Sequence, residues 1–272
     1  HAQLSTNFIT GTTCRVVEGI FDVNARTFTC GSTFTVEDGG TLQRQGAESI
    51  TNPVLNSGST VLYAEDYDDT PDLFTIAHLT YHHLTIDGAE DGASKDTFQL
   101  EAALDVNGHL TITDGTLDVT ATSYPINLAG NWSNSVTFAP RSGTVTLDGA
   151  NQTISGNSTF HNLTKSVTTA RTLTFEKGKT QIITNTMTLT GQLGALLSLR
   201  SSEDDADGDT ADQWKIDPRG TRTISYLDVK DSNNINAIPI STAGFHITDS
   251  GTNTSWTFGI DVSGTVYTNE AK

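Results

Sequence analysis

The chain has 272 residues with 15 Lys+Arg against 32 Asp+Glu, a formal net charge of −17 at pH 7, and 35% hydrophobic residues. A surface this acidic repels the phosphates of nucleic acids and of anionic membranes, so we expect no nucleic-acid partner. The charged fraction of only 17% excludes charge-driven disorder, and the abundance of Thr, Ser, Asn and Gly argues against a helical protein.

Residues 1–18 are expected to form an N-terminal tail or cap. Short apolar and polar alternations follow at 19–23, 27–30, 33–36, 41–42 and 59–63, and each break falls at Gly, Asn or Asp, which turns favour. Strands this short favour the sides of a triangular coil over a β-sandwich, whose strands are usually about 5–6 residues long.

An acidic loop and a group of histidines come next. Asp66, Asp68, Asp69 and Asp72 form a weak calcium candidate, because calcium prefers several carboxylate oxygens. His78, His82 and His83 lie in a segment predicted as strand, which places 78 and 82 far apart and points 82 and 83 to opposite faces. We therefore expect structural histidines rather than metal ligands.

The central part has the clearest period of two, at 103–106, 109–113, 115–119, 126–132, 136–138 and 143–149, with Asn-Gly and Asp-Gly turns between the runs. Such turns also mark antiparallel hairpins, which are the main alternative. Against hairpins, alternate runs share one motif, Gly-Thr-Leu at 115–117 and Gly-Thr-Val at 143–145, as stacked equivalent positions would. In addition, 80–85 (Thr-Tyr-His-His-Leu-Thr) reappears as 159–164 (Thr-Phe-His-Asn-Leu-Thr) at an offset of 159 − 80 = 79 residues. This near-repeat predicts an all-β solenoid of stacked coils over 19–258.

A second acidic segment at 203–212 is the best local signal for a cofactor. With Gly208 as the turn glycine, Glu203, Asp205 and Asp207 take the first three positions of a calcium loop, and Asp209 and Asp212 add carboxylates. Trp214 replaces the usual bidentate Glu, so the alternative is a solvated acidic loop. Calcium is the sole cofactor that we predict.

The last part of the solenoid is predicted at 224–229, 231–236 and 254–258. Asn233, Asn234 and Asn236 are expected to pair between coils and to satisfy turn backbone groups. Residues 259–272 restart a strand pattern through Ile260, Val262 and 265–267, as a terminal strand or the start of a following module.

Four segments resemble repeats in large bacterial cell-surface proteins. They are Gly143-Thr-Val-Thr-Leu-Asp-Gly-Ala-Asn-Gln-Thr-Ile-Ser-Gly-Asn-Ser-Thr-Phe-His-Asn-Leu-Thr-Lys165, Leu197-Ser-Leu-Arg-Ser-Ser202, Gln213-Trp-Lys-Ile-Asp-Pro218 and Thr223-Ile-Ser-Tyr-Leu-Asp-Val-Lys-Asp-Ser-Asn-Asn234. The resemblance spans most of 19–258 and implies a right-handed parallel β-helix that is secreted or adhesin-like. It also implies further extracellular modules, and Gly264-Thr-Val-Tyr-Thr268 is similar to the start of one.

The two cysteines, Cys14 and Cys30, predict one disulfide in an oxidising compartment, with two buried thiols as the alternative. No apolar run approaches the ~20 residues that span a bilayer, so we expect no membrane span. No basic-plus-apolar export signal is present, so any such signal has been removed or left out of this chain. The expected location is extracellular or on the cell surface.

Catalysis has weak support in the sequence. Asp228, Lys230 and Asp231 could resemble the site of a pectin-cleaving β-helix, but neighbouring residues of a strand point to opposite faces. The N-terminal His1 could bind copper only with a second histidine and a different scaffold. We therefore predict no catalytic residues and no enzyme.

The sequence thus predicts a structural or adhesive solenoid whose partners are other copies or cell-surface components. Residues 3–13 and 260–268 could exchange strands between copies and build a filament or sheath. The alternative is a glycan-active enzyme or carbohydrate-binding module. An outer row of aromatic rings would favour that alternative, and the candidates are Tyr81, Tyr124, Trp132, Trp214 and Trp256.

Overall fold

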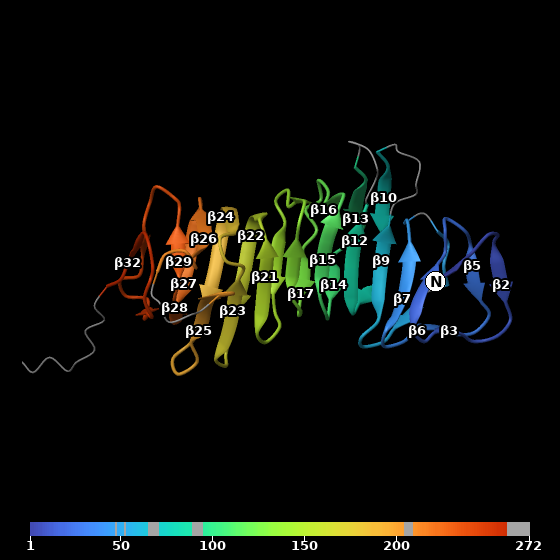
Figure 1. Cartoon of the computed structure of the whole chain (residues 1–272), viewed down its shortest axis with the longest axis horizontal. Helices are drawn as coiled ribbons and strands as arrows, with labels where there is room; N and C mark the ends of the chain where they lie inside the picture. The colour runs from blue at the N-terminus through green and yellow to red at the C-terminus, as the bar shows by residue number, and fades with distance from the viewer. Residues whose placement is uncertain (47, 52, 65–70, 89–94, 204–208, 260–272) are drawn as a thin grey trace, which may run out of the picture.

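The computed structural model describes residues 1–46, 48–51, 53–64, 71–88, 95–203 and 209–259. In these residues every pairing between strands is parallel and no helix occurs. Figure 1 shows an elongated stack of coils with β2 near one end and β32 near the other. The predicted parallel β-solenoid is confirmed, and the hairpin alternative is wrong.

One side of every coil belongs to a sheet that runs the length of the molecule, here called the long sheet. Among the described residues it has 12 strands: β1 (Ala2–Gln3), β4 (Gly19–Asp22), β7 (Gly40–Arg44), β9 (Thr60–Ala64), β12 (His83–Asp87), β15 (Leu110–Asp114), β18 (Trp132–Asn134), β21 (Gln152–Gly156), β23 (Arg171–Phe175), β25 (Leu197–Ser201), β28 (Leu227–Val229) and β31 (Thr248–Asp249).

Two further sheets form the other sides of the middle coils. The second sheet contains β11 (Thr80–Tyr81), β14 (Leu104–Val106), β17 (Ile126–Leu128), β20 (Thr144–Leu147), β22 (Ser158–Ser166), β24 (Thr180–Thr190), β26 (Trp214–Pro218), β27 (Thr221–Ser225) and β29 (Ser232–Asn234). The third sheet contains β10 (Leu73–Ile76), β13 (Thr97–Leu100), β16 (Thr116–Asp118) and β19 (Thr137–Ala139). β24 is long enough to pair with β26 through its first half and with β27 through its second.

Small sheets close the two ends. At the N-terminal end β2 (Phe8–Thr10) pairs with β5 (Phe28–Cys30), and β3 (Cys14–Val16) pairs with β6 (Phe34–Val36), which also pairs with β8 (Pro53–Leu55). At the other end β30 (Ile240–Ser241) pairs with β32 (Trp256–Thr257). Residues 2–16 therefore supply one strand to each side of the outermost coil.

The core is built by side chains that stack in register along the axis. Because side chains alternate across a strand, the apolar residue of each Thr-apolar-Thr run points inward. One column of the long sheet contains Leu42, Val61, Leu84, Leu110, Trp132, Ile154 and Phe175. All of its members are at most 1% exposed, so successive coils bury what a single coil could not.

Asparagine side chains satisfy backbone groups of the turn after β29, as predicted for Asn234 and Asn236. The Asn234 Nδ2 donates to the carbonyls of Ile238 and Ser255, both at 3.1 Å, and its Oδ1 accepts the Asn236 N–H at 3.1 Å. The Asn236 Oδ1 accepts the Ile238 N–H at 3.0 Å. These amides satisfy backbone groups that the short strands leave unpaired.

Candidate functional site

The N-terminal coil pairs on one edge only within the described residues. β1, β2 and β3 each pair with the following coil through Ala2↔Phe21, Phe8↔Phe28 and Cys14↔Phe34. A disulfide between Cys14 and Cys30, with Cα atoms 6.0 Å apart, joins this coil to the next. The predicted disulfide is confirmed, and the other edge of the coil presents backbone donors and acceptors to which a strand can add.

An apolar hollow lies inside this end of the solenoid. It has a volume of about 250 Å³ and is lined by Cys14, Arg15, Val16, Phe21, Phe28 and Phe34. The three rings meet edge to face, with Phe28 at 4.9 Å from both Phe21 and Phe34. We call this space the N-terminal hollow; the sequence gives no direct signal for it, because phenylalanines that alternate with threonines resemble ordinary core residues.

The C-terminal coil combines a pinned core with exposed apolar side chains. The Trp256 indole N–H donates to the Ser232 Oγ at 3.0 Å, which fixes the last coil on the one before it. Ile238 and Phe245 are 68% and 42% exposed. The last coil therefore exposes two large apolar side chains, and the first coil borders the N-terminal hollow.

A lysine pairs with two carboxylates in the described part of the predicted calcium loop. The Lys177 ammonium lies 2.6 Å from the Glu203 Oε2 and 2.6 Å from the Asp212 Oδ1, and these contacts raise the pKa of Lys177, with Asp212 the larger cause. The Asp209 carboxylate accepts the Ala211 N–H at 2.7 Å. Asp205 and Asp207 lie outside the described residues, as do Asp66, Asp68 and Asp69 of the weaker candidate. Calcium binding stays a prediction.

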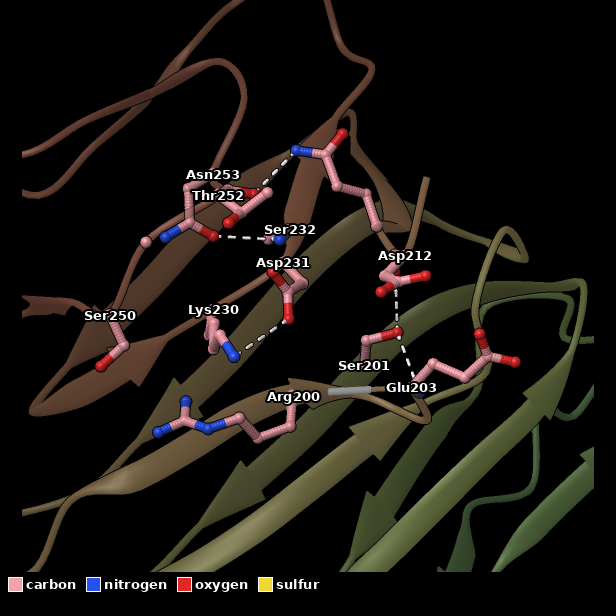
Figure 2. A network of polar contacts seen from close by, with 12 residues as sticks. Arg200, Ser201, Glu203, Asp212, Lys230, Asp231, Ser232, Ser250, Thr252 and Asn253 are labelled. Atoms are coloured by element: carbon pink, nitrogen blue, oxygen red, sulfur yellow. Dashed lines mark hydrogen bonds and ion pairs between the residues drawn. The ribbon is translucent and has the colours of Figure 1, made fainter. Parts of the chain in front are cut away.

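Figure 2 shows the polar contacts around this loop and the next coils. The Ser201 Oγ donates to the Asp212 carbonyl at 2.5 Å, and the Asn253 Oδ1 accepts the Ser232 N–H at 3.0 Å (Figure 2). The Lys230 Nζ lies 3.8 Å from the Asp231 Oδ2 (Figure 2). Each contact joins two coils or holds a turn, so the cluster stiffens this part of the solenoid.

The residues weighed for catalysis take part in the same packing. Asp228 forms an ion pair with Arg200 of the preceding coil and accepts a hydrogen bond from the Ser250 hydroxyl of the following coil. Asp231 is 4% exposed and its backbone N–H donates to the Gly251 carbonyl at 3.2 Å. Asp228 and Asp231 are thus placed as links between coils.

Three histidine rings lie against one another at one corner of neighbouring coils, with His82 edge to face on His83 and His83 stacked on His109. His82 lies between β11 and β12 rather than within a strand, and its ring centroid is 4.3 Å from that of His83. The prediction that 82 and 83 face opposite ways is therefore wrong, because the chain turns there. The His83 Nδ1 accepts the His109 N–H at 3.0 Å, and the His109 Nδ1 accepts the Asn131 N–H at 2.9 Å. The pKa of His83 is lowered by burial and by its neighbours His82 and His109.

A lysine is fully buried in the core. Lys165 is 0% exposed and lies opposite Leu189 in the register of the second sheet. Its ammonium donates to the Gly149 carbonyl at 3.0 Å and to the Gln152 Oε1 at 2.5 Å. Burial lowers the pKa of Lys165 to about 8. From the sequence alone, the burial of Lys165 could be recognised only by working out which positions of each strand face inward.

The aromatic rings that would mark sugar binding are inside the solenoid. Tyr81 and Trp214 are 0% exposed, Trp132 is 1% and Trp256 is 9% exposed. Tyr124 packs partly buried against the same core. These five rings form no outer row, so they give no support to the carbohydrate-binding alternative.

No protein-family model matches this chain, and no match occurs among curated proteins or solved structures. The resemblance to bacterial surface repeats therefore stays a prediction. In the described residues, no three His, Cys, Asp or Glu side chains form a metal-binding group. No helix in the same residues is long and apolar enough to cross a membrane.

Proposed function

We propose that this chain is an extracellular structural solenoid whose copies join end to end into a filament or sheath. The proposal rests on the pairing and the apolar surroundings of the first coil. Among the described residues the strands of the first coil pair on one edge only, and an apolar hollow lies where β3 of this coil meets the next coil. A contact between two different ends is heterologous, and such contacts propagate into an open filament when the rotation from one copy to the next does not close a ring.

The stiffness that a filament needs comes from the parallel coils and from contacts between them. Arg141 pairs with Asp118 of the preceding coil at 2.7 Å, and this hydrogen bond lowers the pKa of Asp118. The Cys14–Cys30 disulfide supports an oxidising location, because disulfides persist outside the cytosol. Because the chain is strongly acidic, copies repel one another when they lie side by side, and this repulsion favours contact through the ends.

Two finer proposals come from the sequence pattern. One is that the filament belongs to the cell surface and acts in adhesion, as the resemblance implies. The other is that calcium binds the loop at 203–212 and stiffens the coils beside it, in competition with Lys177 for the carboxylates of Glu203 and Asp212.

Sedimentation of the oxidised chain at rising protein concentration, with and without a chelator, tests the proposal. We expect species of increasing mass, and negative-stain images of rods that lengthen without becoming wider. Monomers at every concentration under both conditions would contradict it. Bundles that grow only sideways would also contradict it, because they would place the contact on the sheets rather than on the ends.

A further inference from the structure

The N-terminal hollow suits an apolar occupant. Its lining combines three phenylalanine rings with Val16 and Cys14, and Phe28 and Phe34 are buried, at 4% and 1% exposed. A cavity of about 150 Å³ lined by Leu, Ile and Phe already holds a benzene molecule. At about 250 Å³, the hollow has room for more than one aliphatic side chain.

The segment at 260–268 has the pattern of a strand that covers an apolar core. Its even positions are Ile260, Val262, Gly264, Val266 and Thr268, and its odd positions are Asp261, Ser263, Thr265 and Tyr267. Because side chains alternate across a strand, the aliphatic residues share one face and the polar residues share the other. Asp261 is the one charged residue of this segment, and Arg15, which pairs with Glu37 at 2.9 Å, lies at the hollow with 58% of its side chain exposed.

The segment cannot reach the hollow of its own chain. Gly259 lies in the last coil, where its N–H donates to the Thr242 Oγ1 at 3.1 Å. The 268 − 259 = 9 residues beyond it extend at most about 32 Å. The 12 strands of the long sheet define 11 spacings, and at ~4.8 Å each they separate the two ends by about 53 Å.

We propose that residues 260–268 of one copy insert into the N-terminal hollow of the next copy. Val262 and its even-numbered neighbours fill the apolar space, and the backbone of the segment adds as a strand to the free edge of the first coil. The inference rests on the proposed end-to-end assembly and names the two surfaces that form its joint. Strand addition of this kind takes its affinity from main-chain hydrogen bonds and its specificity from alternate side-chain pockets.

Two aspartate substitutions in the full chain separate the joint from other effects. Val262→Asp places a carboxylate on the apolar face, and Ser263→Asp places the same charge one residue away on the polar face. Both follow the last coil in the sequence, so the solenoid folds in either variant. We expect Val262→Asp to weaken assembly at least about tenfold, because a charge in an apolar site is strongly disfavoured, and Ser263→Asp to assemble like the native chain.

Assembly by both variants, or its loss in both, would overturn the proposed joint. In the first case the native chain would still form end-to-end rods, so the proposed function would survive. Rods absent from the native chain would instead contradict the proposed function itself. A benzophenone amino acid at position 266 gives a second readout: we expect crosslinks between copies at 14–34. Crosslinks at 240–259, or on the outer faces of the sheets, would refute the assignment.

Discussion

The buried Lys165 offers a quantitative test of the packing. A pKa of about 8 against an ordinary value of 10.5 means that burial disfavours the charged ammonium by about 3 kcal/mol. Below pH 8 both the folded and the unfolded chain hold the proton, and the folded chain carries this whole cost. Between pH 8 and 10.5 the folded chain has lost the proton while the unfolded chain still holds it, so the free energy of unfolding rises with pH.

The substitution Lys165→Met removes that titration. It leaves the Gly149 carbonyl and the Gln152 Oε1 without their donor, which costs about 1–3 kcal/mol at any pH. The titration of Lys165 is therefore reported by how the difference in free energy of unfolding between the native chain and the variant changes with pH. Between pH 7 and pH 10 we expect the native chain to gain about 2–3 kcal/mol relative to the variant.

Urea titrations of both proteins at the two pH values, followed by tryptophan fluorescence, measure this difference. Lys179→Met is the control, since it removes an ammonium whose side chain is 42% exposed. A difference between native and Lys165→Met that is the same at pH 7 and pH 10 would refute the reasoning. Lys165 would then not be buried among the core leucines.

Three other predictions concern a histidine, two glycines and the acidic loop. His83→Asn keeps an acceptor for the His109 N–H and removes the group whose pKa is lowered, so urea titrations should show a smaller loss of stability from pH 7.5 to pH 5 than in the native chain; an unchanged acid profile would contradict this. Gly178 (φ +72°) has no atom within 4 Å of the place that a Cβ would take, whereas at Gly156 (φ +77°) that Cβ would lie 1.8 Å from the Asn134 carbonyl oxygen. Gly178→Ala should cost roughly 1–2 kcal/mol and Gly156→Ala about 1–3 kcal/mol more, and equal losses on thermal unfolding would contradict the close contact between coils. Lys177→Gln frees the carboxylates of Glu203 and Asp212, so calorimetry should detect tighter calcium binding than in the native chain or in Lys179→Gln, and no calcium binding by any of them would end the calcium proposal.

The fold could be predicted because its signals are local. Thr-apolar-Thr alternation fixes which residues face inward, and Gly, Asn and Asp mark where a side ends. The position of each corner was harder to predict. His82 lies in a run that resembles a strand, yet the chain turns there, since Tyr81 and Leu84 must both face the core. The alternation of apolar and polar residues alone does not show at which residue the chain turns.

The candidate sites were harder to predict than the fold, because they depend on contacts between coils. In the sequence Lys165 resembles a surface lysine, but the register places it opposite Leu189, and its partners are Gly149 in an earlier turn and Gln152 at the start of β21. Lys177 lies 26 residues before Glu203 in the sequence and one coil away in space. The residues of the acidic loop therefore give no sign that Lys177 pairs with them. The N-terminal hollow likewise arises from how the first two coils meet.

Electron cryo-microscopy of the assembled native chain tests the central claim most directly. If copies join end to end with strand pairing continued across the joint, one filament should be as wide as a single solenoid. The 12 strands of the long sheet would then repeat along the axis roughly every 60 Å. Particles that stay single, or solenoids packed side by side with both ends uncovered, would contradict the account.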